Sequence, residues 1–254
     1  MASVRVLVLR AAGINCDEET ALAWEMAGGH PQRIHVRRLV EQPGLLDEFQ
    51  ILTIPGGFSY GDDIASGKIL AGMLMHHAGE RIRQFIDRGG LVLGICNGFQ
   101  VLVRTGLLPG ADCPVRATLT LNDSGHYEDR WVRLRAERSC PFLEAGDEFD
   151  LPVAHAEGKI MIEGGDQNLA EFEAAGRVAL RYQSTDGMPP GYPENPNGSI
   201  GNAAGLIDRT GRVLGLMPHP ERAMLSTQFP IHLRDHSTET SGLRIFQRAI
   251  NACR

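Results

Sequence analysis

Short apolar runs alternate with helical patterns through the N-terminal part of the chain. The runs expected to form strands are Val4–Leu9, Ile34–Val36, Ile51–Ile54 and Leu91–Ile95. The segments with helical spacing are Glu18–Ala27, Lys68–Asp87 and Phe99–Thr105. Apolar strands separated by helices predict a parallel sheet covered on both faces, and such a sheet places its ligand sites at the carboxyl ends of the strands.

From about Pro114 the pattern changes to shorter strands. These are Ala117–Leu121, Trp131–Leu134, Val178–Tyr182, Ala203–Ile207 and Val213–Met217. We interpret them as antiparallel strands added at one edge of the sheet. Residues 184–201 lie between them and are rich in Pro, Gly and Asn. Because this segment is too polar for a core, it is expected to be an ordered loop or an insertion that faces a partner.

Composition fits one compact domain, because 254 residues with 43% hydrophobic and 22% charged side chains can bury a large core. The formal charge is −6, and no basic run is long enough to follow a phosphate backbone, which argues against nucleic acid as a partner. The densest group of arginines interleaves with apolar residues and predicts a half-buried strand instead; it comprises Arg130, Arg133, Arg135 and Arg138. No apolar stretch reaches the roughly 20 residues that a membrane helix needs.

The five cysteines form an odd set without Cys-x-x-Cys spacing. Residues 1–10 are too short and too charged for a signal peptide, so we expect a reducing, cytoplasmic environment. The nine histidines do not pair with Cys, Asp or Glu at ligand spacing, and no bound metal is expected.

A cysteine with a glycine two positions away on each side follows the apolar run at 91–93. Residues 94–98 read GICNG, which is the spacing of a nucleophile elbow carrying a thiol. On such a sharp strand-to-helix turn the nucleophile takes a strained backbone conformation, and the glycines remove Cβ atoms that would collide. The helix N-terminus then favours the thiolate form of Cys96. A buried cysteine in an ordinary turn is the alternative that this segment alone leaves open.

A histidine and a glutamate follow the buried run Val213–Met217, in the string PHPER at 218–222. Alternate side chains of an extended segment share a face, so His219 and Glu221 can face one pocket while the prolines stiffen the loop. In that arrangement His219 is the base for Cys96, and Glu221 fixes the imidazole tautomer and stabilises the imidazolium. A solvated histidine in a surface turn is the alternative for His219 alone.

Residues 55–58, PGGF, come directly after the run Ile51–Ile54. Glycines let backbone N–H groups approach a ligand closely, and the position beside the elbow favours an oxyanion hole. The alternative is an ordinary turn.

The elbow, the Pro-Gly-Gly turn and the Pro-His-Pro-Glu segment resemble the class I, triad-type glutamine amidotransferases, and the order Cys, His, Glu matches. More narrowly, strings over nearly the whole chain are similar to the family of glutaminase subunits of phosphoribosylformylglycinamidine synthase. These strings are NCD at 15–17, GGFSYGD at 56–62, CNGFQ at 96–100, AHAEG at 154–158, NPNGS at 195–199 and PHPER at 218–222. The strings at 56–62 and 96–100 are the most specific. The sequence departs from the family pattern at Ala11–Ile14, which often holds Pro-Gly, and at Ala156, which is frequently Gly.

The resemblance implies an α/β protein with a single flavodoxin-like domain over residues 1–254. Its central sheet would be mostly parallel and flanked by helices, with antiparallel edge strands. The resemblance also implies that Cys96 attacks the side-chain carboxamide of glutamine and that His219 protonates the departing ammonia. Water would then hydrolyse the γ-glutamyl thioester to glutamate.

Four further residues receive roles through the same resemblance. Backbone N–H groups near Gly57 and Asn97 would stabilise the oxyanion, and Gln100 would help to hold the glutamine. His155 would line the same pocket, with a structural role as its open alternative.

A partner also follows from the resemblance. Ammonia would pass through a protected channel to a large formylglycinamidine synthetase subunit, which converts formylglycinamide ribonucleotide in de novo purine biosynthesis. Because no phosphate-binding loop occurs in the chain, ATP and magnesium are expected on that partner and no cofactor is expected here. The need for a third small subunit, and the contacts of extra segments near 189–196 and 229–240, stay open.

Three other functions compete with this one. A stand-alone thiol amidase or peptidase would use Cys96 and His219 identically but would cleave larger substrates, and the string at 56–62 argues against it. A non-catalytic binding subunit would be expected to lack a triad member. A glutaminase subunit of another pathway differs only in its acceptor, and only the most specific strings argue against it.

Overall fold

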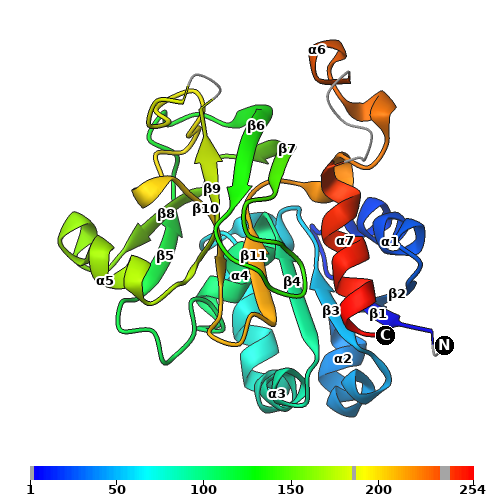
Figure 1. Ribbon diagram of the computed structural model, residues 1–254. Coiled ribbons are helices and arrows are strands. Elements are labelled where there is room, and N and C mark those ends of the chain that lie inside the picture. Colours follow the sequence, from blue (N-terminus) through cyan, green and yellow to red (C-terminus); the bar gives the residue numbers. More distant parts are fainter. Residues whose placement is uncertain (1–2, 185–186, 235–240) are drawn as a thin grey trace.

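The computed structural model describes residues 3–184, 187–234 and 241–254 (Figure 1). Within this part the chain forms a nine-stranded sheet in the order β2-β1-β3-β4-β11-β10-β9-β6-β7 and a separate ribbon of β5 and β8. The strands are β1 (Arg5–Arg10), β2 (His30–His35), β3 (Ile51–Ile54), β4 (Leu91–Ile95), β5 (Ala117–Thr120), β6 (Glu128–Ala136), β7 (Glu148–His155), β8 (Lys159–Ile162), β9 (Val178–Gln183), β10 (Ala203–Ile207) and β11 (Val213–Leu216). The α-helices are α1 (Asp17–Met26), α2 (Val36–Glu41), α3 (Lys68–Asp87), α4 (Asn97–Arg104), α5 (Leu169–Ala174), α6 (Ile231–Arg234) and α7 (Ser241–Ala252).

The sheet has a parallel half and an antiparallel half. Strands β2, β1, β3, β4 and β11 run parallel to one another, as the alternation of strands and helices predicts. Strands β10, β9, β6 and β7 continue the sheet in antiparallel pairs, so they form a substantial extension and not a thin border. The α/β architecture with antiparallel strands at one side is confirmed.

Helices cover both faces of the parallel half. Helices α1 and α7 pack together, while α3 packs with α2 and α4. Right-handed crossovers explain the two layers: the chain steps from β1 outward to β2 through α1, but from β3 in the other direction to β4 through α3. The strands between the layers are buried throughout at β3, β4 and β11, which is why their sequences are almost uniformly apolar.

Two parts of the second half differ from the sequence-based expectation. Residues Ala117–Thr120 do not join the main sheet but pair with β8 in the two-stranded ribbon. The pattern also gave no indication of β7, β8 or α7. Strand β7 contains Pro152 and buries only alternate residues, so it carries no continuous apolar run. Helix α7 buries a stripe at Ile245, Phe246, Ala249 and Ile250 between charged residues.

The polar segment before β10 is ordered at its C-terminal end. Asn195, Asn197 and Ser199 are buried, and Asn197 Nδ2 donates to Tyr182 Oη at 3.0 Å. The Ile160 N–H donates to Ser199 Oγ, so this loop is attached to β8. Of the second extra segment, residues 235–240 lie outside the described residues. Within the described ranges, no helix combines the length and the apolar composition needed to cross a membrane.

Candidate active site

The predicted elbow is present at the carboxyl end of β4. Cys96 has φ 51° and ψ −108°, a backbone conformation that residues other than glycine rarely adopt. Helix α4 begins at the next residue. A Cβ at Gly98 would lie 1.8 Å from the carbonyl oxygen of Ile54, and one at Gly94 would lie 2.7 Å from the carbonyl oxygen of Gly98. The glycines are therefore required by close approach of the backbone, and the thiol is held at the helix N-terminus.

His219 and Glu221 follow β11, the strand that pairs directly with β4. His219 Nδ1 lies 2.6 Å from Glu221 Oε1, and both side chains are almost completely buried. Since an ionised carboxylate only accepts hydrogen bonds, Nδ1 donates, and Nε2 is buried without a hydrogen-bond partner in the described residues. The Cys96 thiol donates to the carbonyl oxygen of Ala154, with Sγ 3.7 Å from that oxygen. Burial by itself would lower the pKa of His219, but the charge of Glu221 and the neighbouring thiols outweigh burial and raise this pKa well above its usual value.

Gly56 lies between the nucleophile and the histidine. A Cβ there would lie 2.8 Å from Cε1 of His219, 3.5 Å from Cβ of Cys96 and 3.2 Å from Sγ of Cys16. The three side chains therefore surround the Cα of Gly56. Only a residue without a side chain leaves room for this arrangement.

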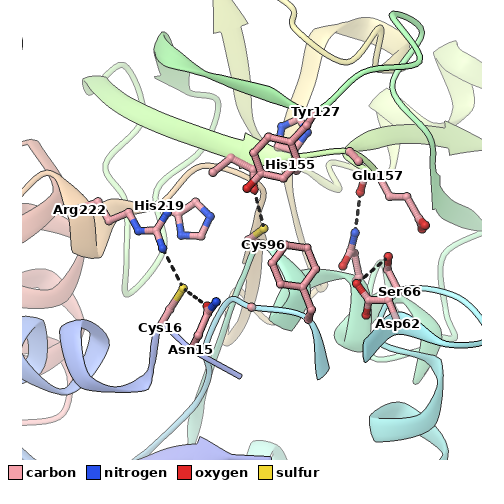
Figure 2. Close-up of a pocket in the computed structure, with 15 residues that line it drawn as sticks. Asn15, Cys16, Asp62, Ser66, Cys96, Tyr127, His155, Glu157, His219 and Arg222 are labelled. Atoms are coloured by element: carbon pink, nitrogen blue, oxygen red, sulfur yellow. Dashed lines mark hydrogen bonds between the residues drawn. The ribbon is translucent and has the colours of Figure 1, made fainter. Parts of the chain in front are cut away.

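The triad opens onto a cavity of about 270 Å³ (Figure 2). Five of the seven predicted site residues line it: Cys96, His219, Gly57, Gln100 and His155. The other two, Asn97 and Glu221, are buried and do not line it. In Figure 2 Asp62 and Glu157 lie at one side of the cavity, Arg222 and His219 lie at the other, and Cys96 is between them.

Asn97 and Gln100 connect the walls of the cavity. Asn97 Oδ1 accepts from the Ser59 N–H at 3.1 Å, and its Nδ2 donates to Asp62 Oδ1 at 3.1 Å and to Gln100 Oε1 at 2.9 Å. Gln100 Nε2 donates to the carbonyl oxygen of Glu157 at 2.6 Å. Both side-chain amides thus support the wall, while the contact of Gln100 with glutamine stays a prediction.

Several residues of this cavity carried no role in the sequence-based prediction. Cys16 is buried, its Sγ accepts from Arg222 Nη2 at 3.2 Å, and it donates to Asn15 Oδ1 at 3.3 Å. Burial raises the pKa of this second thiol. Tyr127 and Phe58 also line the cavity, and each is about half exposed. The strings at 15–17, 56–62 and 218–222 contained Asn15, Cys16, Phe58 and Arg222, so their place in shared motifs was the available signal.

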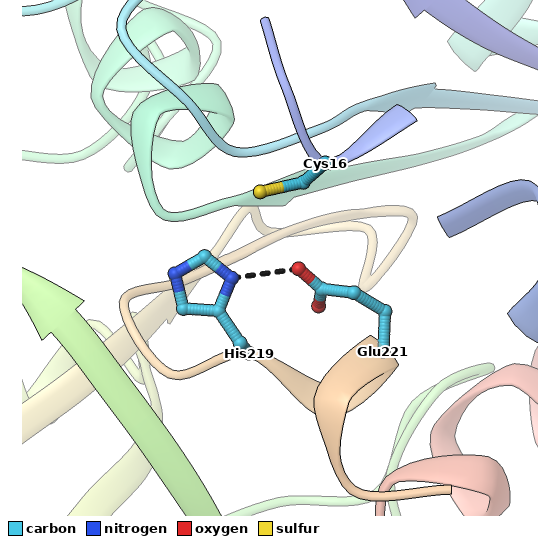
Figure 3. Close-up of side chains that lie close together, drawn as sticks. All are labelled: Cys16, His219 and Glu221. Carbon is cyan, nitrogen blue, oxygen red and sulfur yellow. Dashed lines mark hydrogen bonds and ion pairs between the residues drawn. The ribbon is translucent and has the colours of Figure 1, made fainter. Parts of the chain in front are cut away.

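Cys16, His219 and Glu221 are the one group in the described ranges whose potential metal-ligand atoms lie close together, all within 4.8 Å (Figure 3). His219 Nδ1 is already bonded to Glu221, and the Arg222 guanidinium contacts Cys16 Sγ. A positive charge beside the thiol disfavours a cation there. The geometry therefore suits a base and its orienting carboxylate, and the absence of a resident metal stays a prediction.

The α/β sheet, the strained Cys96 at the end of β4 and the buried His219–Glu221 pair form the arrangement that the resemblance to triad-type glutamine amidotransferases implies. Residues 3–253 match the model of the CobB/CobQ-like glutamine amidotransferase domain, and the chain belongs to this family. The match spans nearly the full length.

Curated relatives narrow the resemblance to one kind of subunit. The chain is 41% identical to a phosphoribosylformylglycinamidine synthase subunit PurQ of Dehalococcoides mccartyi, covering 100% of this chain and 99% of the relative. It is 38% identical to the PurQ subunit of Methanopyrus kandleri, covering 99% of both chains. Among solved structures, a chain of PurLQS from Thermotoga maritima matches with a TM-score of 0.75 at 30% identity, covering 98% of this chain and 99% of that one.

Proposed function

We propose that this chain is the glutaminase subunit of phosphoribosylformylglycinamidine synthase, hydrolysing glutamine and delivering the ammonia to a synthetase subunit in purine biosynthesis. The observation that carries the proposal is the strained Cys96 beside the buried His219–Glu221 pair, in a chain that matches PurQ relatives over its full length. Five unpaired cysteines fit the expected cytoplasmic setting.

In the proposed reaction the Cys96 thiolate attacks the carboxamide carbon of glutamine. His219 holds the proton at Nε2 and transfers it to the nitrogen as the carbon–nitrogen bond breaks. The raised pKa of His219 supports this step, because the imidazolium that precedes transfer is stabilised by Glu221. A γ-glutamyl thioester remains on Cys96, and a water deprotonated by His219 hydrolyses it.

The oxyanion of each tetrahedral intermediate is proposed to lie against the N–H groups of Gly57 and Asn97. The Asn97 N–H is at the first turn of α4, where the helix leaves such donors without partners. Gly57 has φ 133°, and a Cβ there would lie 2.6 Å from the carbonyl oxygen of Gly13. Each donor of this kind typically contributes about 3 kcal/mol to stabilising the transition state.

The partner is proposed to be a PurL-type synthetase subunit, because the matching Thermotoga maritima chain belongs to an assembly named PurLQS. ATP and magnesium are assigned to that partner. A third small subunit is a further element of the proposal, since the name PurLQS denotes an S component beside L and Q.

The test is glutamate release from glutamine by the purified chain, alone and with the synthetase loaded with formylglycinamide ribonucleotide, ATP and magnesium. Release that rises sharply only with the loaded partner would support both the activity and the pathway. Release indifferent to this partner would reassign the chain to another pathway. Cleavage of amides larger than glutamine would instead indicate a stand-alone amidase.

A further inference from the structure

The segment 154–158, where β7 ends and the chain turns toward β8, forms one wall of the cavity. Two of its carbonyl groups face the elbow and the helix that follows it. The oxygen of Ala154 lies 3.7 Å from Cys96 Sγ. The oxygen of Glu157 accepts from Gln100 Nε2 at 2.6 Å (Figure 2). The position of this segment therefore sets the shape of the cavity beside the nucleophile.

Asn197 binds the end of this segment without lining the cavity itself. Its side chain is completely buried, and Nδ2 donates to the carbonyl oxygen of Gly158 at 2.8 Å and to Tyr182 Oη at 3.0 Å. Oδ1 accepts from the N–H of Ser199 at 3.0 Å and from Oγ of the same residue at 2.6 Å. Both donors and both acceptor positions of the amide are thus used, which fixes its orientation.

Asn122 holds the other side of Gly158. Its Oδ1 accepts from the Gly158 N–H at 3.0 Å and lies 3.1 Å from His155 Nδ1. Its Nδ2 donates to the carbonyl oxygens of His126 and His155, at 2.9 and 2.8 Å, so the amide cannot be reversed. Burial lowers the pKa of His155 to about 4, and the neutral ring therefore donates from Nδ1 to Asn122.

Gly158 has little freedom between these two amides. A Cβ there would lie 2.5 Å from His155 Nδ1 and 2.9 Å from Asn197 Nδ2. Ser199 Oγ also lies 3.5 Å from the Gly158 carbonyl oxygen, but it gives its one hydrogen to Asn197. Without the Asn197 donor, the buried oxygen would have to move toward another donor, because leaving it unpaired is costly. The Glu157 carbonyl would move too, because it shares a planar peptide group with the Gly158 N–H.

We propose that Asn197 is a positioning residue for the glutamine cavity. By fixing Gly158 it keeps the preceding carbonyl group on the amide of Gln100. This rests on the proposed glutaminase function and gives a role to the string at 195–199, which the mechanism above does not use. Because its amide has no position left for the triad, Asn197 affects how glutamine is held and not how its carbon–nitrogen bond breaks.

The test compares Asn197→Ser with Tyr182→Phe, as kcat and KM for glutamine in glutamate release with the loaded partner. The serine hydroxyl is too short to reach the Gly158 oxygen, whereas Tyr182→Phe removes another hydrogen bond of the same amide and keeps the one to Gly158. In Asn197→Ser we expect KM to rise about tenfold, the size of one hydrogen bond, while kcat stays within about threefold of wild type. Tyr182→Phe should keep the wild-type KM.

Alkylation of Cys96 by iodoacetamide, followed by mass spectrometry, checks that the elbow is intact. The rate should match wild type in both variants, because Ala154 is paired with Asp129 of β6 and stays beside the thiol.

Asn197→Asp is a second variant in case serine disturbs the packing. It has nearly the shape of asparagine but replaces the donor toward Gly158 by an oxygen, so KM should again rise. Equal KM values in the Asn197 and Tyr182 variants, or a parallel loss of kcat and of Cys96 alkylation, would overturn the proposal and leave Asn197 a structural role only. A wild-type chain whose Cys96 is alkylated but which releases no glutamate would instead refute the glutaminase function itself.

Discussion

Replacing Glu221 by glutamine is expected to remove one charge from the site and little else. Glu221 Oε1 is bonded to His219, but Oε2 is buried without a partner in the described part of the chain. A glutamine can therefore keep its carbonyl oxygen on His219 Nδ1 and place its NH₂ group where no bond is lost. The imidazole tautomer survives, so the variant isolates the electrostatic contribution of the carboxylate.

The size of that contribution follows from the burial of the pair. Two unit charges about 4 Å apart interact by about 4 kcal/mol at an effective dielectric constant of 20. Water screens them little, because the side chains of His219 and Glu221 are 2% and 0% exposed. Since every 1.4 kcal/mol is tenfold, kcat/KM for glutamine should fall by about 10³. The pKa of His219 should also fall, so the alkaline limit of activity should move to lower pH.

The assay is glutamate release with the loaded partner, measured as kcat/KM from acidic to alkaline pH. The control is Glu163→Gln, an exposed glutamate outside the cavity, which should match the wild-type chain. Circular dichroism and the melting temperature check that the fold is kept. A loss below tenfold with an unchanged pH profile would refute the argument that the charge of Glu221 stabilises the imidazolium.

Three further results are expected. Cys96→Ala should abolish glutamine-dependent synthesis while the partner still uses free ammonia; equal loss with both nitrogen sources would mean that the residue supports the complex structurally. Gly98→Ala should lower the free energy of unfolding by about 3 kcal/mol or more, because its Cβ would meet the Ile54 carbonyl. Gly72→Ala, in open space on α3, should raise it by about 0.5–1 kcal/mol. Both changes are measured by denaturant titration. His155 has a pKa of about 4 in the folded chain and about 6.5 in the unfolded chain, so between these pH values the unfolded chain binds one proton more. The free energy of unfolding should therefore fall by up to about 3 kcal/mol as the pH drops through that range. The same titration of His155→Asn should lack this component, and an identical pH dependence would contradict the buried neutral imidazole.

Much of the site was predictable because its signals are local. The elbow needs a strand, two glycines and a helix start within a few residues, so its spacing is visible in any short window around Cys96. The His-x-Glu string is equally compact and follows an apolar strand. The long helix α3 was predicted with its observed bounds because its apolar stripe repeats over 20 residues.

Contacts between distant segments were decided only by the tertiary structure. Cys16 lies close to His219 because β1 and β11 end at the same edge of one sheet. The sequence around Cys16 does not predict this proximity. The pairing of β5 with β8 likewise joins two segments that β6 and β7 separate in the chain. Periodicity indicates which face of a helix or strand is buried, but it does not indicate which other element packs against that face.

The sequence by itself therefore determined the α/β alternation, and it predicted the order Cys, His, Glu of the candidate triad, because each depends on residues adjacent in the chain. Only the tertiary structure decided which residues line the cavity, and which protonation state and tautomer His155 adopts. That state depends on Asn122, whose amide is held by two carbonyl groups, and on burial by a strand that the pattern did not indicate. Burial and hydrogen-bond partners are properties of the packed chain, and they set which nitrogen carries the proton.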